Sequence, residues 1–293
     1  MINLLLSIIV AVSIVSGNSA FLHSGNDFVD NLLQNRSRTN LSGDDINKTG
    51  FELTTATNQP IKQLEGEYLS QAKAVIAIDL ASGEIIYQRN QDSKLPIASL
   101  TKLMTAYVTM KNSPLDRLIE VNNYTLRSND SRANLIAGDR LTVEDLLSAL
   151  LIVSGSDAAQ VLSDNLFDNR ATFIAKMNQA AKDLSLENTN FDNPVGWDSQ
   201  QNYSTAKDTA ILSRVLLSNQ NFRQIVQTRT TTITSQKGNL YTLNSTNYLL
   251  NLDNYFGIKT GFTDGAQGCL SSLYRLNGHE ILVVVLGSDN RFD

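Results

Sequence analysis

Histidine, cysteine and common cofactor motifs are scarce or absent in this 293-residue chain. Its only cysteine, Cys269, excludes an intrachain disulfide, and the apolar run around it predicts a buried structural thiol. A Ser-His-Asp triad needs a histidine inside the site, whereas His23 lies in the N-terminal region and His279 at a predicted hairpin turn. The chain also lacks H-E-x-x-H and G-x-x-x-x-G-K-[ST] motifs. We therefore expect no histidine-based triad, no metal site and no bound cofactor.

Positive charge is also in deficit, because 24 lysines and arginines are set against 29 aspartates and glutamates. A formal net charge of −5 argues against a nucleic-acid-binding protein. The hydrophobic fraction of 42% is that of a globular protein. The length suits one large domain with an inserted lobe, or two small domains.

The most informative stretch places a serine and a lysine three residues apart at the start of an apolar helix. On such a helix Ser99 and Lys102 share one face, so the lysine reaches the serine hydroxyl across one turn. A serine hydroxyl needs a neighbouring base to act as a nucleophile. Burial and nearby positive charge lower the pKa of a lysine to roughly 7–8 in tuned sites. The pair therefore predicts a serine nucleophile that is activated by a lysine.

The same spacing occurs twice more, at Ser70–Lys73 and Ser204–Lys207. Ser70 precedes a predicted strand, where positions three apart point to opposite faces. Ser204 lies at a predicted helix start, where a serine is expected as an N-cap or first-turn residue. Only Ser99 opens a run whose apolar spacing buries one helix face, so Ser99 is the preferred nucleophile.

Two further motifs follow in a fixed order. The apolar stretch 147–153 ends in Ser154-Gly155-Ser156, and Lys259-Thr260-Gly261 lies in a predicted strand. Penicillin-binding proteins and class A β-lactamases share this order of S-x-x-K, a serine triplet and K-T-G. Ordered motifs are more specific than any one of them.

Two other matches are less suitable. Lys48-Thr49-Gly50 precedes the nucleophile and lies in a polar stretch without a strand pattern. Ser163-Asp164-Asn165 has the S-D-N form of the second motif, but it falls on the polar face of a predicted helix. A loop after an apolar helix can direct a hydroxyl into a cleft, so we prefer Ser154.

The apolar patterns predict strands at both ends of the domain and helices between them. The predicted elements are a hairpin of 74–79 and 84–87, helices at 99–111, 142–153 (capped by Thr142), 157–167, 171–183 and 205–218, a β-branched run at 228–234, a strand at 257–261, and a hairpin of 270–274 and 280–286 around Asn277-Gly278. This order predicts an α+β fold, in which an antiparallel sheet packs on helices and carries an inserted helical lobe.

From about residue 72 to residue 293 the chain resembles a low-molecular-weight penicillin-binding protein of the D-alanyl-D-alanine carboxypeptidase family. Segments 98–105 and 257–263 resemble that family almost letter for letter, and segment 196–208 resembles its loop and following helix. The resemblance implies the β-lactamase/DD-peptidase-like fold, with the site between two lobes. It also implies a serine-type D-Ala-D-Ala carboxypeptidase acting on peptidoglycan stem peptides through an acyl-enzyme, with β-lactam antibiotics as inhibitors.

The resemblance gives a role to each motif residue. Ser99 would attack the carbonyl of the penultimate D-Ala, and Lys102 would accept its proton. Ser154 would relay a proton to the departing amine. The positive charge of Lys259 would help to keep Lys102 neutral.

Other residues would bind the substrate. The oxyanion would be held by backbone N–H groups of Ser99 and of Phe262, which follows Gly261 of the third motif. Thr260 and Arg291 would bind the terminal carboxylate, since a guanidinium matches carboxylate geometry. A solvated arginine at the chain end is an equally good interpretation of Arg291.

One position departs from the family pattern, which has asparagine where this chain has Ser156. An asparagine amide carries donors and an acceptor on a longer arm, and in the family it is thought to hold the substrate backbone. We expect Ser156 to bind substrate in part, which leaves the rate and the substrate preference open.

Three alternative functions stay open. The stretch 259–270 also resembles the endopeptidase branch. A β-lactamase would need a carboxylate dedicated to deacylation, and none between Ser154 and Lys259 is persuasive. A weakly catalytic cell-wall-binding protein is motivated by Ser156. The sequence does not identify the group that activates the deacylating water.

The first 66 residues are expected to lie outside the catalytic domain, which we assign to 67–293. Residues 4–15 are apolar apart from two serines and are followed by small residues, so 1–20 predict a signal peptide or an N-terminal anchor, although Met1-Ile2-Asn3 has no basic residue. Residues 21–66 lack periodicity and predict a disordered linker. We expect an exported monomer in the periplasm or on the outer face of the cytoplasmic membrane, attached only through its N-terminal segment. Family members commonly continue past the position of Asp293 with a helix on the sheet, so we expect either another cover for the sheet or an incomplete sequence.

Overall fold

The computed structural model describes residues 72–276 and 279–289. The predicted signal segment, the linker, the K-T-G match at 48–50, Ser70, the turn at 277–278 and Arg291 lie outside these residues. Within the described part of the chain, no helix is both long and apolar enough to cross a membrane.

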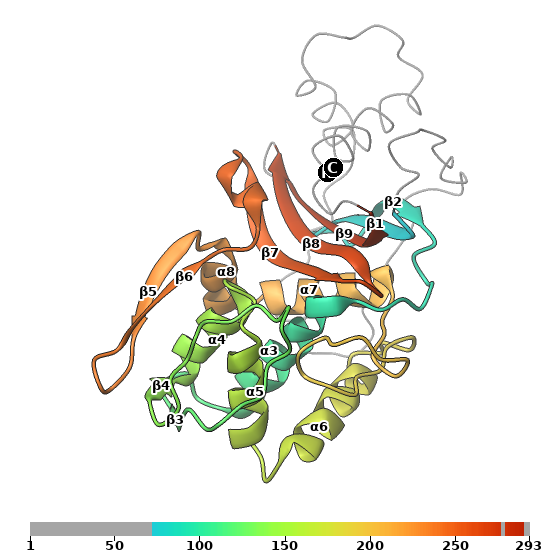
Figure 1. The fold of residues 1–293 in the computed structure, drawn as a ribbon. Helices are drawn as coiled ribbons and strands as arrows, with labels where there is room; N and C mark the ends of the chain where they lie inside the picture. Colours follow the sequence, from blue (N-terminus) through green and yellow to red (C-terminus); the bar gives the residue numbers. More distant parts are fainter. Residues whose placement is uncertain (1–71, 277–278, 290–293) are drawn as a thin grey trace, which may run out of the picture.

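A five-stranded antiparallel sheet joins the two ends of the described chain. Its strands are β1 (Ala74–Asp79), β2 (Ile85–Arg89), β7 (Tyr255–Thr263), β8 (Gln267–Leu276) and β9 (His279–Ser288). The spatial order is β2-β1-β9-β8-β7, so the early strand β1 pairs with the last strand β9. This order leaves β7, which carries the third motif, at one edge of the sheet (Figure 1).

Six helices lie between β2 and β7 in the chain. They are α3 (Thr101–Asn112), α4 (Val143–Leu151), α5 (Ser156–Asn165), α6 (Arg170–Asp183), α7 (Ala206–Leu217) and α8 (Gln220–Gln227). Helix α7 packs against β1, β8 and β9, whereas α3 to α6 pack on one another as a separate lobe (Figure 1). The sheet and the inserted helical lobe are the α+β arrangement that the sequence predicted.

Local capping explains where several helices begin. Thr142 and Asp145 form a reciprocal capping box at the start of α4, as the predicted cap required. Thr205 is the N-cap of α7 and accepts from the Asp208 amide, so Ser204 precedes the cap rather than forming it. The predicted helix at 99–111 begins as a 3-10 turn, η3 (Ala98–Leu100), before α3 continues it.

Two short hairpins complete the fold. Strand β3 (Leu118–Glu120) pairs with β4 (Arg140–Thr142), and β5 (Thr230–Thr234) pairs with β6 (Leu240–Asn244). Of these strands, the sequence patterns predicted only the run that contains β5. A 3-10 turn, η4 (Tyr248–Asn251), then leads toward β7.

The alternation of apolar side chains along β1 separates two cores. Ile76 and Ile78 belong to the large core shared with the helices, whereas Val75 and Ala77 belong to a smaller cluster with Leu249 of η4. A period of two places such neighbours on opposite faces of a sheet. The sheet is therefore apolar on both faces, and its helical side supports the site.

Candidate active site

Ser99 and Lys102 lie at the junction of η3 and α3, under the edge of the sheet. The Lys102 ammonium donates to Ser99 Oγ at 2.9 Å and to the Val195 carbonyl at 2.9 Å. Lys102 is only 1% exposed, so it can act on a substrate only through the hydroxyl of Ser99. The geometry suits transfer of a proton between Ser99 and Lys102.

Burial sets the protonation of Lys102. Loss of water around the ammonium lowers the pKa of Lys102 from 10.5 to about 8, while the negative charges of Asp130 and Asp157 raise it. A pKa near 8 leaves part of the lysine neutral at physiological pH. Burial is the largest of these effects, and the contribution of the Lys259 charge that the family resemblance implied stays a prediction.

The loop between α6 and α7 holds the lysine in place. Asn193 Oδ1 accepts hydrogen bonds from the backbone amides of Val195, Gly196 and Trp197, at 3.2, 2.7 and 3.0 Å. This turn presents the Val195 carbonyl to Lys102. The sequence resemblance included part of this loop but gave no role to Asn193 or Val195.

Gly196 lies against the backbone that precedes the nucleophile. It has φ +96°, and a Cβ built on it would be 2.0 Å from the Ala98 carbonyl oxygen. Gly238 is a matched case, because it has φ +85° but nothing within 4 Å of a built Cβ. Of these two glycines, Gly196 alone combines a left-handed backbone with a close approach.

We expect Gly196→Ala to destabilise the protein far more than Gly238→Ala. The positive φ alone costs roughly 1–2 kcal/mol in either variant, and the clash at Gly196 raises the loss above about 4 kcal/mol. Denaturant unfolding of the two variants and the wild type measures the difference. Equal losses of unfolding free energy would contradict the close approach at Gly196.

The second motif lies opposite the nucleophile, in the turn between α4 and α5. Ser154 is buried at φ +62°, and Lys259 Nζ donates to its hydroxyl at 2.8 Å. Lys259 is 2% exposed and also donates to the Thr260 carbonyl at 2.8 Å. The second and third motifs, 105 residues apart, therefore meet through a lysine–serine hydrogen bond.

Ser156 occupies the first position of α5 and is buried. Its backbone amide donates to the Ser131 carbonyl at 2.8 Å. The next residue, Asp157, accepts from the amides of Ala133 and Leu135 at 3.1 and 3.2 Å. The start of α5 thus fixes the loop at 131–135 beside the site.

Strand β7 forms one side of the site. A Cβ on Gly261 would lie 3.1 Å from the Ser99 amide nitrogen, so the third motif passes directly beside the nucleophile. Thr260 is buried, and Phe262 is 49% exposed. The structure therefore brings together Ser99, Lys102, Ser154 and the 259–262 segment, while Arg291 lies outside the described residues.

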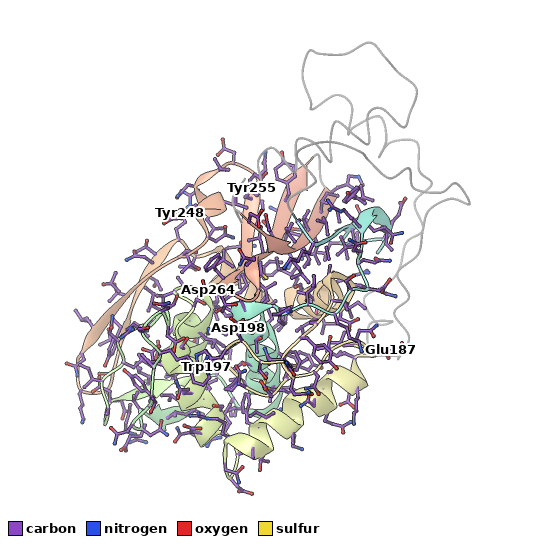
Figure 2. All side chains as sticks on the ribbon, turned by 45° about the vertical axis from the view of Figure 1, so that its right-hand side comes forward. Glu187, Trp197, Asp198, Tyr248, Tyr255 and Asp264 are labelled. Atoms are coloured by element: carbon purple, nitrogen blue, oxygen red, sulfur yellow. The ribbon has the colours of Figure 1, made fainter. Side chains whose placement is uncertain are left out.

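Trp197 and Asp198 connect the two lobes across the site, a role that the sequence patterns did not indicate. The Trp197 indole donates to Asp130 Oδ1 at 2.9 Å, which joins the loop to the helical lobe. Asp198 accepts from the Thr263 hydroxyl at 2.5 Å and from the Gly265 amide at 3.1 Å, which joins it to the end of β7. Figure 2 shows Trp197 and Asp198 near Asp264, where the sheet meets the helical lobe.

The competing sequence matches have local partners of their own. Ser163 donates to the Gln160 carbonyl within α5, and Asp164 pairs with Arg170.

Cys269 is buried in β8, as predicted. No group of three or more metal-ligating side chains lies together within the described residues.

Comparison with known proteins places this geometry in a family context. A family model described as D-alanyl-D-alanine carboxypeptidase matches residues 55–290. The D-alanyl-D-alanine carboxypeptidase of Streptomyces sp. (strain K15) is 32% identical, over 82% of this chain and 86% of that protein. The D-alanyl-D-alanine endopeptidase of Pseudomonas aeruginosa is 33% identical, over 75% of this chain and 72% of that protein.

A third relative and a solved structure complete the comparison. D-alanyl-D-alanine carboxypeptidase DacF of Bacillus subtilis is 28% identical over 76% of this chain, which spans only 59% of that relative's length. The crystal structure of the Streptomyces K15 DD-transpeptidase has a TM-score of 0.71 and 33% identity, over 75% of this chain and 91% of that chain.

Proposed function

The chain belongs to the D-alanyl-D-alanine carboxypeptidase family, and from this premise we propose that it is a serine-type carboxypeptidase of peptidoglycan stem peptides that is also acylated by β-lactams. The family membership confirms the resemblance of the three motifs. One observation carries the proposal: two buried lysines each meet a serine, Lys102 with Ser99 and Lys259 with Ser154. One pair suits attack on a carbonyl, and the other suits departure of the amine.

Acylation begins at Ser99. Neutral Lys102 takes the hydroxyl proton while Ser99 Oγ bonds to the carbonyl carbon of the penultimate D-Ala. Backbone N–H groups of Ser99 and Phe262 hold the resulting oxyanion, and one such donor contributes on the order of 3 kcal/mol in the transition state. Gly261 must be small here because its backbone approaches Ser99 so closely.

The C–N bond then breaks, and the leaving D-Ala amine needs a proton. Ser154 supplies it, because the ammonium of Lys259 donates to its hydroxyl oxygen and leaves the hydroxyl hydrogen free to move. The proton that Lys102 took from Ser99 then returns to Ser154, so Lys102 is neutral again and Lys259 keeps its charge. Water finally cleaves the acyl-enzyme, which releases the shortened peptide and restores the Ser99 hydroxyl.

Thr260 and Ser156 serve the substrate rather than the bond changes. Thr260 lies one residue from Lys259 on the edge strand, where a terminal carboxylate would meet both a hydroxyl and a positive charge. Arg291 adds a guanidinium for the same carboxylate. Ser156 lies at the start of α5, two residues from Ser154, and binds the peptide backbone only through its short side chain.

The substrate also sets the location. Peptidoglycan lies outside the cytoplasmic membrane, so the enzyme works as an exported protein, and the apolar residues 4–15 supply its export signal. Whether the periplasm or the membrane face holds it depends on cleavage of that segment.

Endopeptidase action is the second candidate. The observation that favours it is the 33% identity to the P. aeruginosa D-alanyl-D-alanine endopeptidase. A cross-linked peptide and an unlinked one present the same D-Ala carbonyl, so the catalytic groups suit both.

Mass spectrometry of products tests the proposal. The full chain is incubated with a pentapeptide that ends in D-Ala-D-Ala, and separately with a cross-linked dimer. We expect loss of one D-Ala from the pentapeptide; faster cleavage of the dimer would favour the endopeptidase instead. Turnover of neither, with a penicillin adduct that persists, would favour the cell-wall-binding alternative. Rapid hydrolysis of penicillin alone would favour a β-lactamase.

A further inference from the structure

A second threonine hydroxyl lies beside the one in the third motif. Thr246 Oγ1 and Thr260 Oγ1 are 2.7 Å apart. Thr260 is buried on β7, whereas Thr246 is half-buried in the segment between β6 and η4. The sequence patterns gave Thr246 no role.

The backbone of Thr246 is fixed on the helical-lobe side. Its amide donates to the Ile152 carbonyl at 3.1 Å, two residues before Ser154. The flanking residues are fixed as well, since the Ser245 amide donates to the Arg229 carbonyl at 2.8 Å and the Asn247 amide to Ser245 Oγ at 3.1 Å. The hydroxyl of Thr246 is therefore held in position between the second and third motifs.

Hydrogen-bond accounting shows what this pair can do. Two hydroxyls carry two donor hydrogens, and only one hydrogen can lie between the two oxygens. The other hydrogen can be donated to a ligand. Both hydroxyl hydrogens can also rotate toward a ligand, if the ligand is a stronger acceptor than the neighbouring hydroxyl oxygen. A carboxylate is such an acceptor, because hydrogen bonds to a charged oxygen are roughly twice as strong as neutral ones.

The local charge favours an anion at this place. Lys259 Nζ donates to the Thr260 carbonyl and to Ser154 Oγ, so a buried ammonium lies against the backbone of the residue that carries one of the two hydroxyls. We propose that Thr246 is a substrate-binding residue, and that Thr246 and Thr260 together bind the terminal carboxylate of the substrate. This inference rests on the proposed function, because it names the contact that selects a free D-Ala carboxylate.

Binding to an inactive full-length chain tests it directly. In the Ser99→Ala background, calorimetry compares a peptide that ends in D-Ala-D-Ala carboxylate with the same peptide as its C-terminal carboxamide. We expect the background variant to bind the carboxylate peptide about tenfold or more tightly than the carboxamide. Adding Thr246→Val should reduce that preference by about tenfold, and adding Thr246→Ser, which keeps the hydroxyl, should preserve it.

Thr242→Val is the matched control, because Thr242 is exposed on β6 and its hydroxyl faces that of Thr232 at 3.4 Å. It should leave the preference unchanged. An unchanged preference in the Thr246→Val variant, or no preference in the background variant, would overturn the inference. A lower melting temperature for Thr246→Val with the carboxylate preference intact would show that Thr246 stabilises the fold and does not bind the substrate.

A separate experiment tests the proposed function on which this inference rests. It measures penicillin acylation of Ser99 in the wild type and in the single variant Thr246→Val. Absence of an adduct on both proteins counts against the acyl-enzyme, whereas the carboxylate preference in the Ser99→Ala background reports on Thr246 alone.

Discussion

The Ser99→Ala variant is expected to form no covalent adduct with penicillin and to lose carboxypeptidase activity by about 10⁴-fold or more. In the proposed mechanism Ser99 Oγ bonds to the substrate carbonyl, and Lys102 Nζ lies 2.9 Å away to take the proton. Without the hydroxyl, the remaining groups can bind substrate but cannot form an acyl-enzyme. Intact-mass spectrometry of the full chain with penicillin measures the adduct directly.

A matched serine in the same chain controls this experiment. Ser204 has the same spacing to Lys207 as Ser99 has to Lys102, but its hydroxyl is paired with Thr189 Oγ1 at 2.7 Å. Ser204→Ala should keep the adduct. An adduct on Ser99→Ala, or its loss in Ser204→Ala with the fold intact, would point to a different nucleophile.

The sequence predicted those parts of the site that depend on local geometry. Ser99 and Lys102 are one helical turn apart, so their contact follows from helix periodicity alone. Thr142 followed by Asp145 is a capping signal that marks the start of α4. The strands β1 and β9 were also found, because their β-branched runs are bounded by turn residues. Strand β8 was found as the partner of β9, on the other side of the turn signal Asn277-Gly278.

Contacts between distant segments could not be predicted in this way. The Val195 carbonyl meets Lys102 across 93 positions, and Asp198 meets Thr263 across 65. Neither contact leaves a periodic pattern, because backbone carbonyls have no sequence signature and a loop aspartate is ordinary in composition. The pairing of Thr246 with Thr260 was missed for the same reason.

Short elements were missed because their patterns are weak. Helix α8 has eight residues, and β6 alternates over only five. Such windows are too short to separate a periodic signal from chance. The hairpin that contains β6 nevertheless leads directly into Thr246, so a weakly patterned segment supplies part of the candidate site.

The pH dependence of acylation should report Lys102. Only the neutral amine can accept the Ser99 proton, and burial lowers the pKa of Lys102 to about 8. The acylation rate should therefore rise with pH, by about tenfold per unit well below 8, and level off above it. Lys102→Met should lower the rate by about 10³-fold or more at every pH, measured by the rate of penicillin adduct formation.

Replacing Asp130 should shift the pH profile of acylation in one direction, which a general structural effect would not do. Its negative charge raises the pKa of Lys102 against the larger lowering by burial. Asp130→Asn removes that charge and keeps an oxygen for the Trp197 indole, which donates to Asp130 at 2.9 Å. The pKa of Lys102 should then fall, so the pH profile moves to lower pH and acylation at pH 6 becomes faster relative to the plateau. A profile that stays in place or moves to higher pH would show that Lys102 is not the group that titrates. The base that activates Ser99 would then have to be another group near the serine.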